Sequence, residues 1–88
     1  MFTAHVRVTL RPSILDPEGK AIRSAISDLG MPGVESVRTG KFFELHVDAP
    51  SAEAAEAQVR QVADRLLANP VTEDFAILAL VPSEGVTA

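Results

Sequence analysis

The groups of this 88-residue chain that could do acid–base or metal chemistry are few and widely spaced. His5 and His46 are its two histidines, and neither has a carboxylate at a spacing typical of metal ligands. Asp16 and Glu18 form a carboxylate pair, but a helix start accounts for both, because an N-cap oxygen accepts hydrogen bonds and acidic groups favour the first turn. We therefore expect no catalytic residue, no metal site and no bound cofactor in this chain.

Composition excludes further classes of protein. There is no cysteine, no serine in a Gly-x-Ser-x-Gly setting, and no glycine cluster that could form a phosphate-binding loop. Residues 1–43 carry a charge balance of +2 and residues 44–88 one of −6. A net charge of −4, with four Phe and no Tyr or Trp, argues against nucleic acid as a partner. No apolar run approaches the roughly 20 residues that span a bilayer, and the alternating N-terminus is not a signal peptide, so we expect a cytoplasmic protein without a membrane partner.

The first half of the chain predicts a strand followed by a helix. Residues 2–11 alternate between apolar and polar, which is typical of a strand with one buried face. Asp16 as the N-cap and Pro17 at the first helical position predict a helix over residues 17–29. Gly30 ends this helix as a glycine in the left-handed conformation.

The second half predicts an extended region, a helix and a strand. Residues 34–48 are extended, and the Thr39–Lys41 segment is either a tight turn between two strands or a kink within one. Ser51 is a suitable N-cap for an alanine-rich helix, which Asn69-Pro70 ends. Residues 75–81 form the last strand.

The last strand is apolar on both faces, unlike the first. Simple alternation places Ala76, Leu78 and Leu80 together on the face that a two-layer domain leaves open. An apolar open face indicates burial against another chain. We therefore expect these three residues to lie in an oligomer interface.

The element order predicts an α+β fold in two layers. A β-α-β(β)-α-β order is typical of a ferredoxin-like domain, in which two helices cover one face of a mostly antiparallel sheet. We expect one domain over residues 1–81 and a flexible C-terminal tail over residues 82–88.

Three segments together resemble the PurS family, the small subunit of bacterial and archaeal phosphoribosylformylglycinamidine synthase. They are Val8–Arg11 with Ile14–Lys20, then Val37–Leu45, and finally Leu66–Phe75. The resemblance covers about residues 2–81 and implies the PurS-like version of the ferredoxin-like fold.

The resemblance also implies a function in purine biosynthesis. In that family the PurL subunit performs the ATP- and Mg²⁺-dependent ligation, and the PurQ subunit releases ammonia from glutamine. The small subunit carries no catalytic residue; it forms a homodimer that joins PurL to PurQ and assists ammonia transfer. Whether the dimers of this chain pair into tetramers in isolation is left open.

Two of the matching segments are candidates for contact with PurL or PurQ. The candidate residues are Asp16, Pro17, Gly19, Lys20, Arg38, Gly40 and Lys41. Gly19 and Gly40 are costly inside regular elements unless another backbone approaches closely, so we expect alanine at either position to weaken assembly more than folding. The alternatives are an ACT-like regulatory domain that binds a small molecule at a dimer interface, and a structural homo-oligomer without a purine role.

Overall fold

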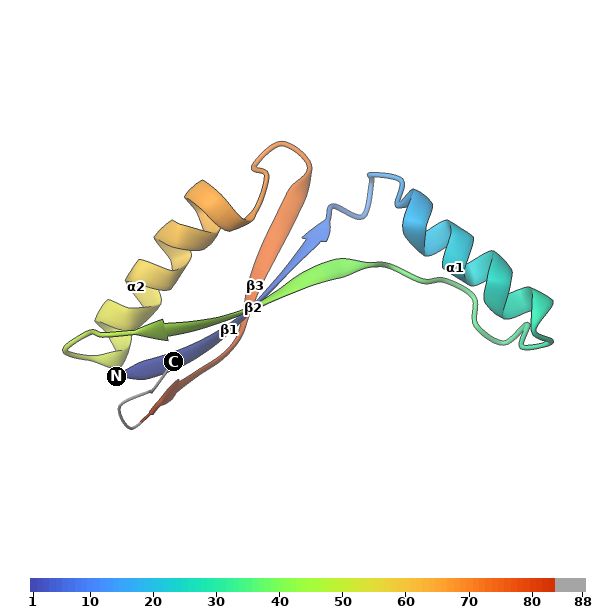
Figure 1. Ribbon diagram of the computed structural model, residues 1–88. Coiled ribbons are helices and arrows are strands. Elements are labelled where there is room, and N and C mark those ends of the chain that lie inside the picture. The colour runs from blue at the N-terminus through green and yellow to red at the C-terminus, as the bar shows by residue number, and fades with distance from the viewer. Residues whose placement is uncertain (84–88) are drawn as a thin grey trace.

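Three strands form one antiparallel sheet in the order β2-β1-β3 (Figure 1). They are β1 (Phe2–Leu10), β2 (Gly40–Val47) and β3 (Glu73–Pro82). The structure is a computed structural model that describes residues 1–83. The predicted α+β class and antiparallel sheet are confirmed.

The core is built on the central strand. Ala4, Val6 and Val8 of β1 are fully buried, as the alternating pattern predicts, while Arg7 between them is exposed on the opposite face. Phe43, Leu45, Val47, Phe75 and Ile77 from the two outer strands pack against these residues.

One helix covers the buried face of the sheet. It is α2 (Ala52–Val62), which starts at the predicted N-cap, where the Ser51 hydroxyl accepts a hydrogen bond from the N–H of Ala54. A five-residue π-helical turn, η1 (Ala63–Leu67), continues it. Val59 and Ala63 are buried against β1, so this helix closes the core.

The other helix, α1 (Pro17–Asp28), begins and ends as predicted but lies elsewhere. Asp16 is its N-cap, and Gly30 beyond its end has φ +86°. We expected both helices on one face of the sheet, and this is wrong for α1, which projects from the end of the sheet as an arm (Figure 1). Apart from buried Gly19 and half-buried Ile26, its residues are exposed. Apolar residues at helical spacing show which side of a helix is apolar, but they do not show which surface covers that side.

The extended region before α2 contains one strand and no hairpin. The regular strand is β2, and residues 34–39 before it run outside the sheet. The alternative of a tight turn at Thr39–Lys41 is therefore excluded, because Gly40 already pairs with Thr9 of β1.

A β-bulge changes the faces of β3. Val6 of β1 pairs with Ile77, whereas Ala4 pairs with Leu80, so Leu78 is an extra residue on β3. Leu80 therefore lies on the α2 side with Ile77 and packs against the core. The prediction that it shares the open face with Ala76 is wrong, because simple alternation does not hold across the bulge.

β3 ends one residue beyond the predicted domain boundary. Pro82 pairs with Phe2, and the N–H of Ser83 donates a 2.8 Å hydrogen bond to the carbonyl of Met1. The rest of the predicted tail, residues 84–88, lies outside the described residues.

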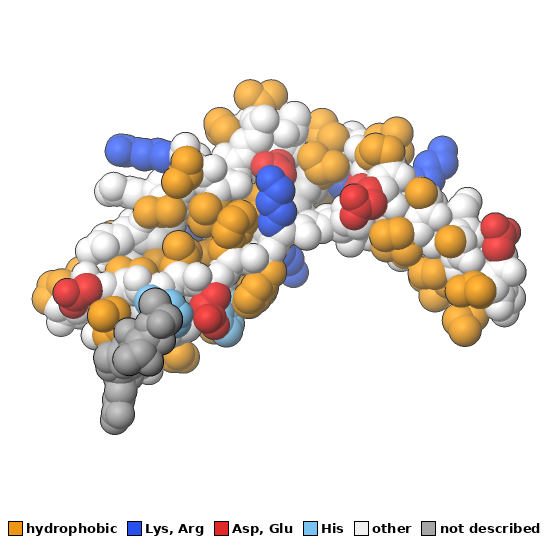
Figure 2. Space-filling model, in the orientation of Figure 1, with side chains coloured by type: hydrophobic (Ala, Val, Ile, Leu, Met, Phe, Trp, Pro, Cys, Tyr) orange, Lys and Arg blue, Asp and Glu red, His pale blue; other side chains and the backbone are white. Residues whose placement is uncertain are grey.

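The chain is extended for its size. Its radius of gyration is 16.5 Å, compared with about 12 Å for a compact domain of this length. The α1 arm and the sheet with α2 form the two sides of an arch (Figure 2). Orange apolar side chains follow the lower side of the arm in that view. A single copy therefore leaves part of its apolar surface without cover.

Candidate functional site

The two segments that carry the first two motifs meet at the base of the arm. The Asp16 carboxylate is 4% exposed. One oxygen accepts a 2.9 Å hydrogen bond from the N–H of Gly19, and the other accepts bonds of 2.7 and 2.8 Å from the N–H and hydroxyl of Thr39. Asp16 therefore joins the start of α1 to the chain that enters β2.

These hydrogen bonds favour the ionised carboxylate. The bond from the Gly19 N–H, followed by the two from Thr39, lowers the pKa of Asp16 from its ordinary 3.8 to about 2. The nearby Arg38 guanidinium adds a smaller effect in the same direction. Asp16 is thus an anion throughout the physiological pH range. Its carboxylate oxygens accept hydrogen bonds from Gly19 and Thr39 of the same chain.

The close approach that we expected at Gly19 and Gly40 is real, but the approaching backbone belongs to this chain. A Cβ on Gly19 would lie 2.3 Å from the carbonyl oxygen of Val37. A Cβ on Gly40 would lie 2.7 Å from the carbonyl oxygen of Val8 and from the Thr9 methyl group. Both glycines are needed for the arm to join the sheet, so folding explains them before any contact with another subunit does.

Arg38 holds the loop between β1 and α1. Its Nη2 donates hydrogen bonds to the carbonyls of Leu10, Arg11 and Ile14, at 3.3, 2.9 and 3.0 Å. All three acceptors are neutral, so they orient the guanidinium without cancelling its charge. Arg38 is exposed and lines a surface cavity, which leaves its other edge available to a second molecule.

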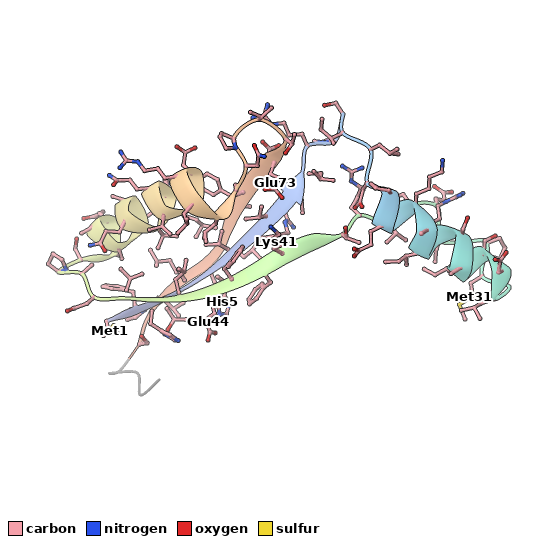
Figure 3. The ribbon with its side chains drawn as sticks, turned by 45° about the horizontal axis from the view of Figure 1, so that its top comes forward. Met1, His5, Met31, Lys41, Glu44 and Glu73 are labelled. Atoms are coloured by element: carbon pink, nitrogen blue, oxygen red, sulfur yellow. The ribbon has the colours of Figure 1, made fainter. Side chains whose placement is uncertain are left out.

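The remaining contact candidates point outward. Pro17, Lys20 and Lys41 are exposed, and the ion pairs within residues 1–83 include neither lysine. Lys41 lies on β2 (Figure 3) and lines a surface cavity together with Glu18 and Glu73. These three side chains are therefore available for contact with another subunit, unlike Asp16 and Gly19.

The oligomer candidates on β3 have different surroundings. Leu78, at the bulge, is 49% exposed, and Ala76 is half-buried on the open face. Leu80 packs on the core side and is the weakest of the three as an interface residue.

The histidines lie together on the open face of the sheet. The Nε2 atom of His5 is 2.9 Å from Glu44, which also lies 3.5 Å from His46 (Figure 3). The His5 ring also packs against the ring of Phe42 at a tilt of 57°, with the centroids 5.1 Å apart. Residues 1–83 contain no group of three His, Cys, Asp or Glu side chains that could hold a metal ion.

Sequence reasoning missed two features of this region. Thr39, whose bonds to Asp16 close the base of the arm, looks like an ordinary turn residue in the sequence. The sequence predicts that the apolar side of α1 faces the core, and its pattern gives no signal that this side is exposed.

Within residues 1–83, none of the helices has the length and hydrophobicity of a membrane-spanning segment.

Comparison with known proteins gives one consistent family. Residues 3–80 match the family model PurS, phosphoribosylformylglycinamidine (FGAM) synthase. The chain is 45% identical to phosphoribosylformylglycinamidine synthase subunit PurS of Synechocystis, over 84% of this chain and 74% of that protein. No comparison favours the ACT-like alternative.

Solved structures agree with the sequence comparison. Thermus thermophilus PurS superposes with a TM-score of 0.84 at 38% identity, covering 94% of this chain and 98% of that one. A chain in the structure of PurLQS from Thermotoga maritima superposes with a TM-score of 0.81 at 30% identity. That match covers 86% of this chain and 93% of the other.

We predict that Asp16→Asn lowers stability at neutral pH and removes part of its acid dependence. The pKa of Asp16 in the folded chain lies below its ordinary value, so its stabilising effect is complete above about pH 4 and is lost as the pH falls towards 2. Asparagine cannot ionise and would present a donor to the Thr39 N–H. Urea unfolding at pH 7, 4 and 2.5 should show the difference between the two proteins shrinking with acid. A constant difference would contradict this account.

We predict that Gly19→Ala destabilises the isolated protein by about 1–3 kcal/mol, because the new methyl group overlaps the Val37 carbonyl. Gly33→Ala is the matched control, since a Cβ there meets nothing within 4 Å. It should change stability by less than about 0.5 kcal/mol. Thermal unfolding of both variants measures the difference. Equal effects of the two substitutions on stability would mean that folding does not explain Gly19, and would favour a contact of Gly19 with another subunit.

Proposed function

The chain belongs to the PurS family of phosphoribosylformylglycinamidine synthase subunits, and we propose that it acts as the non-catalytic subunit that joins PurL to PurQ. In this role the complex converts formylglycinamide ribonucleotide, ATP and glutamine to formylglycinamidine ribonucleotide, ADP, phosphate and glutamate. The observation that carries the proposal is the match to PurS over residues 3–80, supported by the likeness to a chain of PurLQS from Thermotoga maritima.

The surface of the chain supports a role in assembly. Pro17 and Lys20 lie in the first turn of α1, Lys41 lies near the start of β2, and all three are exposed. Asp16 and Gly19 fix the backbone that carries them, through bonds and contacts within the chain. We propose that the exposed residues contact PurL or PurQ, while the buried ones hold them in position.

The same role assigns the cofactors to another subunit. We propose that PurL binds ATP and Mg²⁺ and that PurQ binds glutamine. We propose that this chain binds none of the three. Purine biosynthesis takes place in the cytoplasm, and we propose that location for this chain.

We propose further that the chain is a homodimer in which α1 packs against a second copy. The radius of gyration, 16.5 Å, is well above the roughly 12 Å of a compact domain of this length. Four apolar side chains on or just after α1 are 39–74% exposed: Ile22, Leu29, Met31 and Val34. Leu78 adds an exposed apolar side chain on the sheet. A second copy supplies apolar area of the same kind, so pairing would cover surface that a monomer exposes.

Glutamine-dependent synthesis should require this chain. In a mixture of its cognate PurL and PurQ with formylglycinamide ribonucleotide, ATP, ADP, Mg²⁺ and glutamine, product formation should fall at least tenfold when the chain is left out. Ammonia-dependent formation by PurL alone should not change, because it needs no transfer from PurQ. Unchanged glutamine-dependent activity without the chain would refute the proposed function.

Leu29→Glu should weaken the homodimer at least tenfold, because it places a charge on the apolar side of the arm. Val71→Glu is the matched control: Val71 is 75% exposed and Leu29 74%, but Val71 lies in the turn before β3. Sedimentation equilibrium gives the dissociation constants. If both variants keep the wild-type mass, or if both lose it equally, the arm is not the dimer contact.

A further inference from the structure

A cavity of about 580 Å³ opens beside β1 near the base of the arm. Its polar lining comes from Arg7, Thr9, Arg38 and Asp74, and its apolar lining includes Pro12 and Ala76. Arg7 and Thr9 lie on the open face of the sheet, because Val6 and Val8 beside them point into the core. The cavity is thus on the side of the sheet that α2 does not cover.

The lining of the cavity carries more positive than negative charge, with two arginines and one aspartate. The ion pairs within residues 1–83 do not include Arg7 or Arg38. The one carboxylate of the lining, Asp74, is engaged 3.4 Å from the Nε atom of Arg11 just outside it. Arg38 donates hydrogen bonds to neutral carbonyls through Nη2, and the Asp16 anion lies near enough to interact with its guanidinium. Two guanidinium groups therefore line one cavity in a chain whose net charge is −4.

This combination fits a carboxylate that sits beside an apolar group. Guanidinium groups bind carboxylates through paired hydrogen bonds, and arginine is enriched among residues that dominate protein interfaces. The apolar walls would accept a neighbouring aliphatic or aromatic side chain. An acidic protein segment offers both groups at once.

We infer that this cavity is the docking site for an acidic segment of a partner subunit, with its carboxylate held by Arg7 and Arg38. The inference rests on the proposed role in joining PurL to PurQ and adds the chemistry of the contact.

The test compares two charge reversals in the complete complex. Arg7→Glu inverts one charge of the cavity, and Arg65→Glu makes the same change on an exposed residue of η1 that no ion pair within residues 1–83 includes. Titration of each variant into cognate PurL and PurQ should give a dissociation constant at least tenfold higher for Arg7→Glu. For Arg65→Glu the change should stay below threefold. Arg7→Gln should lie between them and should show a weaker dependence on salt than the wild-type chain.

Four outcomes would overturn the inference. Equal effects of Arg7→Glu and Arg65→Glu would mean that only the net charge matters. Loss of the homodimer in Arg7→Glu, read from its mass in solution, would make a second copy the occupant. Failure of the wild-type chain to bind PurL and PurQ would refute the proposed function itself, whereas normal assembly of Arg7→Glu refutes only the docking site. Unchanged thermal unfolding of Arg7→Glu shows that the variant is folded.

Discussion

The hydrogen bonds of the Asp16 carboxylate are the interaction on which the placement of the arm depends. They fix the first turn of α1 through Gly19 and the approach to β2 through Thr39. Asp16 and Thr39 are 23 residues apart in the sequence. Because the carboxylate is nearly inaccessible to water, leaving either side without its partner would cost free energy. One side chain therefore sets where the arm leaves the sheet.

The rest of the chain divides into a packed part and an arm that differ in how they are stabilised. Val6, Val8 and Val59 are buried in the packed part, so the sheet and α2 have a core of their own. The arm is held by polar contacts at its base, by the Arg23 hydrogen bond to the Glu35 carbonyl, and by its own helical bonds. Its apolar side is left for another molecule, which fits a subunit whose function is assembly.

The residues through which the chain resembles the PurS family have two kinds of role. Asp16, Gly19 and Gly40 are explained by contacts within the chain, and Arg38 both holds a loop and lines the charged cavity. Lys20 and Lys41 are exposed and have no such internal explanation. A motif that marks a binding surface can therefore consist largely of residues that shape the backbone beneath that surface.

The sequence by itself determined the local structure: the buried face of β1, the capped start of α1 at Asp16, and the helix that begins after Ser51. Hydrophobic periodicity and capping act over a few residues, so they can be read along the chain. Only the tertiary structure decided that α1 leaves the sheet, that the bulge at Leu78 turns Leu80 towards the core, and that Thr39 meets Asp16. These depend on contacts between distant segments, and a local pattern shows that a face is apolar without showing what covers it.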